Sequence, residues 1–270
     1  GLRTSLPSQT RDYSMSTAVV WSCAHVTPKA DNKRFEWLGN LIFDIKPDYT
    51  VDLGDFADLA SLNSYDTRYP KAIVSQSYQA DIEATIEAQE LIWDKFAKRK
   101  TRKPYRIGIQ GNHEYRIDRA VSIDPRIEGK KYGVSFEHLQ TRRFYDEYHR
   151  YKNSAPAIVE RDGVYYSHFI SSGNFGAALS GIHHGYALTQ KVAASCTVGH
   201  SHIRHYYCKQ DAKPTPIHGL VVGNFKGKED SWAGQAQNNW WSGVVIKRNI
   251  QNGNYDLQFI SMEALEKDYG

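Results

Sequence analysis

Cysteine is scarce in this chain, and long apolar runs are missing from it. Three cysteines, Cys23, Cys196 and Cys208, occur among 270 residues. An odd and sparse count argues against a disulfide framework and is typical of a protein kept in a reducing cytosol. No apolar stretch reaches the roughly 18 residues that a membrane-spanning helix requires, and the polar N-terminus lacks the apolar segment of a signal peptide. We therefore expect a cytoplasmic protein that does not enter a membrane.

Neither sign of charge dominates the sequence. The 34 Lys and Arg residues nearly balance the 30 Asp and Glu residues, which leaves a formal net charge of +4. This mild excess is too small to indicate nucleic-acid binding by itself. The densest basic run, from Lys98 to Arg106, has two interpretations. It is either a solvated helix end that the helix dipole favours or a contact for a phosphate backbone.

Hydrophobic residues make up 40% of the chain, which is enough for a sizeable core, and their order predicts an α/β fold. A short apolar stretch at residues 18–22 predicts a buried strand. We expect a helix after it, with Asp31 as its N-cap. A strand within residues 46–55, a helix over residues 71–98 and a strand within residues 104–111 should follow. This alternation predicts parallel strands with helices outside them.

The second half of the sequence has a different pattern of secondary structure. A fourth strand is expected within residues 162–169, a helix over residues 184–195 and a fifth strand within residues 196–202. From Ile203 onward, apolar stretches separated by turns predict antiparallel strands. One of these turns contains Asn252-Gly253, a pair typical of tight hairpins.

No internal repeat, low-complexity stretch or linker divides the sequence. We therefore expect residues 1–15 to form a flexible N-terminal segment. Residues 16–270 should form a single domain with a parallel half and an antiparallel half.

Polar side chains of the kind that bind metals recur where the expected strands end. In a parallel sheet the carboxyl ends of the strands open on one face, so residues far apart in the sequence can converge there. Imidazole, carboxylate and amide ligands suit first-row divalent metals. Each residue alone is a weak signal, because a single strand histidine is more often a hydrogen-bonded core residue, but the ordered set is a strong one. The set consists of Asp55, Asp58, Asn112, His113, Glu114, His168, His200 and His202.

The order and spacing of these residues resemble the motifs of the calcineurin-like metallophosphoesterases. That family carries the patterns D-x-H, GD-x-x-D, GNH-D/E, H and GH-x-H in this order. The resemblance implies an α/β fold, a four-layer α/β/β/α sandwich in which two mixed β-sheets are flanked by helices. The succession of antiparallel strands expected in the C-terminal part is similar to that of phage-encoded members, which would function in the cytoplasm of a bacterial host. The matching segments are Cys23-Ala24-His25, Gly54-Asp55-Phe56-Ala57-Asp58, Gly111-Asn112-His113-Glu114, His168 and Gly199-His200-Ser201-His202.

The resemblance also implies two bound divalent metal ions, with manganese as the expected ion and iron, zinc and nickel as alternatives. Two cations about 3.5–4 Å apart neutralise a phosphate ester and activate the water that attacks it. A carboxylate suits the bridging position because its two oxygens can reach both ions. The implied ligands are His25 and His202 for the first metal, Asn112, His168 and His200 for the second, and Asp55 for both, with Cys23 at the position of a further ligand of the first metal.

Two residues would take part in catalysis by this resemblance, Asp55 through the metals and His113 directly. His113 would not be a ligand; it would sit over the phosphate and help to protonate the leaving oxygen. Asn112 and His113 would also bind the substrate phosphate. Arg116 is a further candidate for phosphate binding, although a surface ion pair explains it equally well. His184 could line the substrate side, although a helix cap or a surface position explains it better.

Cys23 stands where the family carries an aspartate, and three explanations are open. The thiolate could replace the aspartate as a ligand, because a metal deprotonates a coordinating thiol, and sulfur would bias the site toward softer ions such as zinc or iron. Cys23 could instead be a small buried hydrophobe that leaves the first metal one ligand short. The site could also have decayed to a scaffold, although the retention of His113 favours activity.

We expect a divalent-metal-dependent phosphoesterase, and a phosphodiesterase or nuclease in particular. The basic run favours this class, as do three tryptophans that could stack on bases, Trp232, Trp240 and Trp241, although a core position explains these better. A phosphomonoesterase or protein phosphatase comes second, and the segment after Gly54-Asp55 lacks the Asp-Arg-Gly ending of the Ser/Thr phosphatases. A non-catalytic, protein-binding scaffold is the third alternative. The expected partner is a phosphate ester, with nucleic acid as a candidate; the sequence indicates no membrane partner and no particular oligomeric state.

Overall fold

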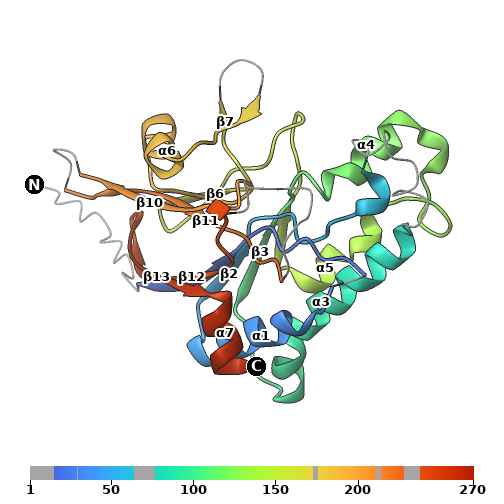
Figure 1. The fold of residues 1–270 in the computed structure, drawn as a ribbon, viewed down its shortest axis with the longest axis horizontal. Helices are drawn as coiled ribbons and strands as arrows, with labels where there is room; N and C mark the ends of the chain where they lie inside the picture. The colour runs from blue at the N-terminus through green and yellow to red at the C-terminus, as the bar shows by residue number, and fades with distance from the viewer. Residues whose placement is uncertain (1–14, 29, 64–76, 173–175, 211–213, 228–237) are drawn as a thin grey trace, which may run out of the picture.

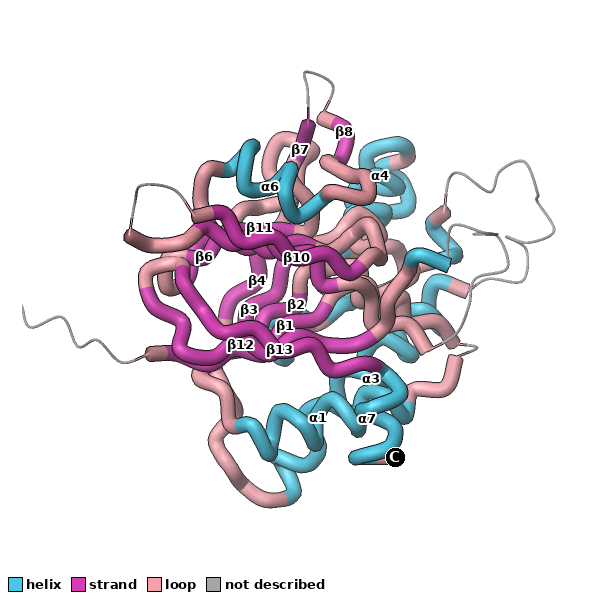
Figure 2. The backbone as a smooth tube through the Cα atoms, turned by 60° about the vertical axis from the view of Figure 1, so that its left-hand side comes forward, coloured by secondary structure: helices cyan, strands magenta, loops and turns pink. Residues whose placement is uncertain are grey.

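Two β-sheets stacked face to face form the centre of the molecule (Figures 1 and 2). The computed structural model describes residues 15–28, 30–63, 77–172, 176–210, 214–227 and 238–270. The first sheet has six strands in the order β13-β12-β1-β2-β3-β4, and the second has five in the order β10-β11-β9-β6-β5. The strands of the first sheet are β1 (Ser16–Trp21), β2 (Tyr49–Asp52), β3 (Tyr105–Ile109), β4 (Glu147–His149), β12 (Gly243–Gln251) and β13 (Asn254–Ser261). Those of the second are β5 (Val159–Arg161), β6 (Val164–Ser167), β9 (Cys196–Val198), β10 (Arg204–Lys209) and β11 (Ile217–Val222).

Both sheets are mixed. Strands β1, β2, β3 and β4 run parallel to one another, whereas β12 pairs antiparallel with β1 and with β13. In the second sheet β6, β9 and β11 are parallel, and β5 and β10 are antiparallel edge strands. A short hairpin of β7 (Ser171–Ser172) and β8 (Ala177–Ala178) stands apart from both sheets.

Helices cover the outer faces of the two sheets (Figures 1 and 2). Helices α1 (Lys33–Ile45), α3 (Tyr78–Lys98) and α7 (Met262–Tyr269) lie below the first sheet, and α6 (His184–Val192) lies above the second. This arrangement confirms the expected four-layer α/β/β/α sandwich. The shorter helices are η1 (Ala60–Leu62), α4 (Tyr115–Ile123), η3 (Pro125–Ile127), η4 (Phe136–Leu139) and α5 (Thr141–Phe144).

Alternating side chains of β1 fill two different layers of the core. Ala18 and Val20 point into the layer between the sheets, while Val19 and Trp21 point toward the helices below. Successive side chains of a strand point to opposite faces, so a strand that is buried on both faces reads as a continuous apolar run. The run recognised at residues 18–22 is therefore continuous because both of its faces are covered.

Several elements differ from their expected positions. Asn32 directly precedes α1 but makes no side-chain cap hydrogen bond. The Asp31 carboxylate, one residue earlier, accepts a hydrogen bond from the Lys33 backbone N–H at 2.9 Å and so supplies the expected cap. The expected fourth and fifth strands, β6 and β9, belong to the second sheet. Their carboxyl ends therefore reach the rim shared with β1, β2 and β3 across the sheet–sheet interface. Strand β4 and helix α7 were not expected from the sequence at all.

Other expectations are confirmed or fall outside the described residues. Asn252 and Gly253 both have positive φ angles, 51° and 84°, and connect β12 to β13 as the expected tight turn. Helix α3 begins at Tyr78, and residues 71–76, which the sequence assigned to it, lie outside the described residues. The expected flexible segment lies outside them too, apart from Met15. Among the described residues, no helix combines the length and the apolar character needed to cross a bilayer.

Candidate metal centre

The loops that follow β1, β2, β3, β6 and β9 meet at one rim of the two sheets. Hydrogen bonds between their backbones join the loops. Cys23 N–H donates to the carbonyl oxygen of Gly54 (2.9 Å), and Gly199 N–H donates to that of His168 (3.1 Å). Phe225 N–H donates to the carbonyl oxygen of Cys23 (3.2 Å), so the segment after β11 joins the same rim.

Two glycines allow the loops after β2 and β3 to approach each other. Gly54 has a φ of +94°, and a Cβ atom there would lie 2.5 Å from the backbone nitrogen of Gly111. A Cβ atom on Gly111 would lie 2.2 Å from both the backbone nitrogen and Oδ1 of Asp55. A side chain at either position would therefore push Asp55 out of place.

The rim also concentrates backbone strain. Left-handed φ angles are uncommon for residues other than glycine, and such strained positions cluster at functional sites. Five candidate site residues have φ angles from 45° to 64° in the described chain: Cys23, His25, Asp55, His200 and His202. Each such residue costs about 1 kcal/mol or more, so the surrounding loops hold these side chains in one orientation against a local preference.

Asp55 lies at the centre of the site. Its Oδ1 accepts a hydrogen bond from the His113 backbone N–H at 2.8 Å, which leaves Oδ2 facing the histidines. Oδ2 lies 3.2 Å from His168 Nε2 and 3.9 Å from His25 Nε2. The sequence argument expected each oxygen to reach one ion, whereas here the single atom Oδ2 stands between the two sets of ligand atoms.

The first set surrounds His25. Its Nε2 lies 3.1 Å from Nε2 of His202, and the two rings meet nearly edge-on at 76°. Two nitrogens that bind one ion at about 2.0–2.1 Å are themselves about 3 Å apart. The atoms Cys23 Sγ, His25 N and His202 N all lie within 4.8 Å of one another.

The second set surrounds His168. Its Nε2 lies 2.9 Å from Asn112 Oδ1 and 3.2 Å from His200 Nδ1. The structure therefore brings together every residue that the sequence proposed as a metal ligand, in two groups on either side of Asp55.

The hydrogen-bond chemistry of His168 fits a bound cation. His168 Nδ1 faces the carbonyl oxygen of Leu53 at 2.8 Å, so this nitrogen carries a proton. In the neutral ring, Nε2 then has a lone pair, and it faces two oxygen acceptors, Asn112 Oδ1 and Asp55 Oδ2. A lone pair directed at two acceptors is unfavourable unless a positive charge lies between them. A divalent metal held by these three atoms would supply that charge, and without a metal Asp55 raises the pKa of His168 and favours a proton on Nε2.

The pKa values of the other histidines favour the same interpretation. Burial lowers the pKa of His25 and of His200 to about 4 and that of His202 to about 2. At neutral pH these imidazoles are uncharged and keep the lone pair that a metal requires. Burial alone would raise the pKa of Asp55, but the surrounding histidines, His168 above all, hold it well below the ordinary value. His25, His200 and His202 are thus in their metal-binding form, whereas the charge of Asp55 raises the pKa of His168 and favours a positive charge at that ring.

Cys23 lies among the ligand atoms of both groups. Its Sγ is within 4.8 Å of the ligand atoms of His25 and His202, and equally of those of Asp55 and His168. The sulfur accepts a hydrogen bond from the His200 backbone N–H at 3.3 Å. Burial raises the pKa of the thiol well above its ordinary value, so the sulfur would ionise only with a cation beside it.

Asp58 supports two of the site histidines. Its Oδ1 lies 3.2 Å from His25 Nδ1 and 3.0 Å from His113 Nδ1. His113 Nδ1 also lies 2.9 Å from the carbonyl oxygen of Asp58. These acceptors fix the proton on Nδ1 of both rings. The second nitrogen, Nε2, is then free to bind a metal in His25 and to exchange a proton in His113.

Arg116 lies beside Nε2 of His113. Its Nη2 is 3.2 Å from His113 Nε2, and its Nη1 donates to the carbonyl oxygen of Asp58 at 2.8 Å. Of the two explanations left open by the sequence, a phosphate contact agrees with this place. Among the described residues Arg116 forms no ion pair within 4.0 Å.

Glu114 holds the loop that carries Asp55. Its buried carboxylate accepts three backbone hydrogen bonds, from Asp55 (3.0 Å), Ala57 (2.9 Å) and Gly111 (2.9 Å). The sequence placed Glu114 in the GNHE motif but could not show that its partners are the backbone of the preceding loop.

His184 lies beneath the rim rather than at its surface. Its side chain is fully buried at the start of α6, and its Nδ1 lies 3.1 Å from Ser201 Oγ, between His200 and His202 in the sequence. The structure therefore gives His184 a place in supporting the GHSH loop and no contact with solvent.

Two residues outside the motifs lie at the edge of the site: Trp240, which the sequence offered as a candidate for base stacking, and Lys226, which it did not single out. The Trp240 ring lies 4.4 Å from that of His202 and nearly perpendicular to it. The charge of Lys226 contributes to the lowered pKa of His25 and of His202, and its Nζ lies 5.8 Å from the Trp240 ring. Neither residue belongs to a motif, so only the three-dimensional structure reveals them. Trp241 instead packs on Phe259, and Trp232 lies outside the described residues.

Comparisons with known proteins give weak likenesses. No protein-family model and no curated protein matches the chain. Among solved structures, Yfce, a phosphoesterase from E. coli, is 10% identical, with 91% of this chain and 99% of that chain covered and a TM-score of 0.37. Vps29 from Chaetomium thermophilum is also 10% identical, with 91% and 97% covered and a TM-score of 0.36. Any functional conclusion therefore has to rest on the residues of this chain.

Proposed function

We propose that this chain is a divalent-metal-dependent phosphoesterase, similar to the calcineurin-like enzymes, that hydrolyses phosphodiesters. The observation that carries the proposal is the arrangement of imidazole nitrogens around Asp55 Oδ2. His25 Nε2 lies on one side of this oxygen at 3.9 Å, and His168 Nε2 lies on the other at 3.2 Å. Such a pair of sites with a shared carboxylate is suited to binding two cations close together.

The residues of the chain would divide the chemistry among them. Two bound cations would neutralise the phosphate ester and lower the pKa of the attacking water. Asn112 and Arg116 would orient the phosphate through an amide and a guanidinium. His113, with Nδ1 held by Asp58 at 2.9 Å, would present Nε2 to the leaving oxygen and donate a proton to it.

The direct test is hydrolysis of two model substrates by the purified protein. Bis-p-nitrophenyl phosphate and p-nitrophenyl phosphate would be offered with manganese, nickel, iron or zinc, and bound metal would be counted by elemental analysis. We expect faster turnover of the diester. Faster turnover of the monoester would show that the protein is a phosphomonoesterase. No turnover with any metal would favour the non-catalytic scaffold.

Variants separate the roles of the site residues. His113→Ala should keep both metals and lose about 10²- to 10⁴-fold in kcat, the usual contribution of an acid–base group. Asp55→Ala should lose both metals and all activity. His138→Ala is the matched control, because His138 binds Tyr78 and Lys130 instead of site residues. Loss of metal from the His113→Ala protein would contradict the role assigned to His113.

A further inference from the structure

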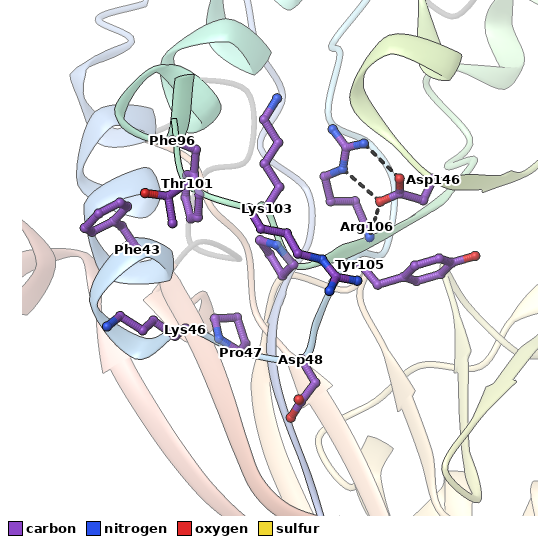
Figure 3. A pocket seen from close by; sticks show the side chains of 12 residues that line it. Phe43, Lys46, Pro47, Asp48, Phe96, Thr101, Lys103, Tyr105, Arg106 and Asp146 are labelled. Carbon is purple, nitrogen blue, oxygen red and sulfur yellow. Dashed lines mark hydrogen bonds and ion pairs between the residues drawn. The ribbon is translucent and has the colours of Figure 1, made fainter. Parts of the chain in front are cut away.

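A basic pocket lies at the opposite edge of the first sheet from the candidate metal centre. It is a cavity of about 550 Å³ between the ends of α1 and α3 and the beginning of β3 (Figure 3). We call it the basic pocket, and the side chains that matter in it are Phe43, Lys46, Arg102, Lys103, Tyr105 and Arg106. The basic run from Lys98 to Arg106, for which the sequence allowed two interpretations, thus contributes to the lining of a cavity.

The pocket carries more positive charge than its own carboxylates balance. Four cations and two carboxylates line it, which leaves 4 − 2 = +2. Asp146 is already paired with Arg106 in a two-pronged contact of 2.9 and 3.0 Å, visible in Figure 3. The other carboxylate, Asp48, accepts a hydrogen bond from the Thr17 backbone N–H at 2.7 Å.

Three cations of the pocket remain without an acidic partner. Within the described part of the chain, Lys46, Arg102 and Lys103 form no ion pair within 4.0 Å, whereas neighbouring Lys95 and Lys98 each have an aspartate. Burial, and then the charge of Arg106, lower the pKa of Lys103. Concentrating like charges in a hollow raises the local positive potential and attracts an anion.

Aromatic side chains stand beside these charges. The Tyr105 ring is 39% exposed and extends outward from the pocket, and Phe43 forms part of its wall (Figure 3). A groove of cations that follows the backbone, with exposed aromatic rings on which bases stack, is how proteins bind single-stranded nucleic acid without sequence preference. A small anion would need the charges but not the ring.

The place of the pocket fits a long substrate. Tyr105 begins β3, and Asn112 follows its carboxyl end, 112 − 105 = 7 residues later. At about 3.3 Å per residue, the two ends are roughly 20 Å apart. At the rise of about 3.4 Å per nucleotide of a stacked strand, this distance corresponds to about six nucleotides.

We propose that the basic pocket binds the phosphates of a single-stranded nucleic-acid substrate whose scissile bond lies at the metal centre. The proposal rests on the proposed phosphoesterase function and names its substrate class. Lys46, Arg102 and Lys103 contact phosphates, and Tyr105 stacks on a base. A model diester is too small to reach the pocket, so the pocket affects only polymeric substrates.

Binding of a labelled oligonucleotide tests the proposal. Fluorescence anisotropy would follow a 4-nucleotide and a 12-nucleotide oligothymidylate with the manganese-loaded His113→Ala protein over a range of salt concentrations. Combining Lys46→Gln, Arg102→Gln and Lys103→Gln should weaken binding of the 12-mer at least tenfold at low salt. The slope of log K against log salt should become about 2 smaller in magnitude, since each lost phosphate contact contributes about 0.7 for single strands. The 4-mer is too short to reach from the pocket to the metal centre, so the protein with an intact pocket should bind it more weakly than the 12-mer.

The matched control combines Lys131→Gln, Lys152→Gln and Lys191→Gln, three exposed lysines outside the pocket. It removes the same charge and should leave the slope as in the parent. Equal slopes for the two triple variants would overturn the proposal, and so would tighter binding to phosphatidylserine vesicles than to the 12-mer. Hydrolysis of bis-p-nitrophenyl phosphate by the protein with an intact His113 keeps the two ideas apart: its absence rejects the proposed function, while an unchanged salt slope rejects only the pocket.

Discussion

Cys23 decides the character of the first metal position. An aspartate there would present a hard oxygen, whereas the sulfur lies within 4.8 Å of imidazole nitrogens on one side and of Asp55 on the other. The His200 N–H and the Ser22 hydroxyl, at 3.3 and 3.1 Å, can both donate to a thiolate. Both contacts are compatible with a neutral thiol as well, so the thiolate ligand stays one of the three explanations and needs a direct test.

We expect the cobalt-loaded protein to show a sulfur-to-cobalt charge-transfer absorption in the near ultraviolet. Cys23→Ser should abolish this band and weaken zinc binding about tenfold or more, because even the loss of a supporting residue costs 10- to 100-fold. Cys208→Ser is the control, since Cys208 is exposed on β10. A band that survives in the Cys23→Ser protein and disappears in the control would exclude the thiolate ligand.

The grouping of the candidate ligands could be predicted from the sequence because each follows a strand and most belong to a short motif. The positions of Lys226 and Trp240 beside His202 could not, since both residues come from segments without any motif and reach it only through the fold. The contacts of Glu114 were equally hidden, because its partners are backbone N–H groups, which every residue except proline has. Sequence reasoning recognises residues that belong to motifs. It misses contacts made by backbone groups and by residues outside the motifs.

At the scale of elements, the close packing of α1 against α3 depends on one glycine. Gly39 lies in the middle of α1, where an Ala would be favoured by about 1 kcal/mol. A Cβ atom at this position would lie 2.3 Å from the carbonyl oxygen of Ile92 in α3. The obstacle is backbone, which cannot turn away as a side chain can.

Gly39→Ala should therefore destabilise the protein in spite of the gain in helix propensity. We expect the free energy of unfolding to fall by about 1–3 kcal/mol, the usual cost of overpacking a core, measured by urea unfolding. Glu36→Ala, an exposed position of the same helix, should change it by no more than about 0.5 kcal/mol. A Gly39→Ala protein as stable as the parent would show that α1 and α3 can separate at little cost.

The long elements were predictable, and the short ones were not. Helix α3 and strands β1, β3 and β12 have enough residues for an apolar period to be recognised. Strand β4 has three residues, too few for any period, and is held by its parallel pairing with β3. Which sheet a strand joins was also not readable, because β9 is buried on both faces just as β1 and β2 are.

At the scale of the whole molecule, one lysine connects the two sheets. Lys247 of β12 is fully buried, and its Nζ donates to Thr197 Oγ1 of β9 and, at 3.4 Å, to Tyr166 OH of β6. The amine also lies 4.5 and 4.3 Å from the rings of Tyr166 and Tyr255. Burial holds the pKa of Lys247 well below its usual value. The ionisable groups around it cannot pair with a cation at neutral pH, because burial raises the pKa values of Tyr166, Tyr255 and, to about 12, Cys196.

The stability of the protein should therefore rise with pH because of Lys247. In the folded state the amine is neutral above its lowered pKa, while in the unfolded state it binds a proton up to about pH 10.4. The unfolded state thus holds more protons across this window, and the free energy of unfolding gains about 1.4 kcal/mol per pH unit from this residue. Below the folded pKa both states are protonated and the gain stops. Lys247→Met keeps the apolar stem and removes the titration. In urea unfolding it should make the slope smaller by that amount over the pH range between the lowered folded-state pKa and about 10.4. Parallel slopes for the two proteins would mean that Lys247 keeps its proton in the core, and the sheets would then have to separate far enough to admit water.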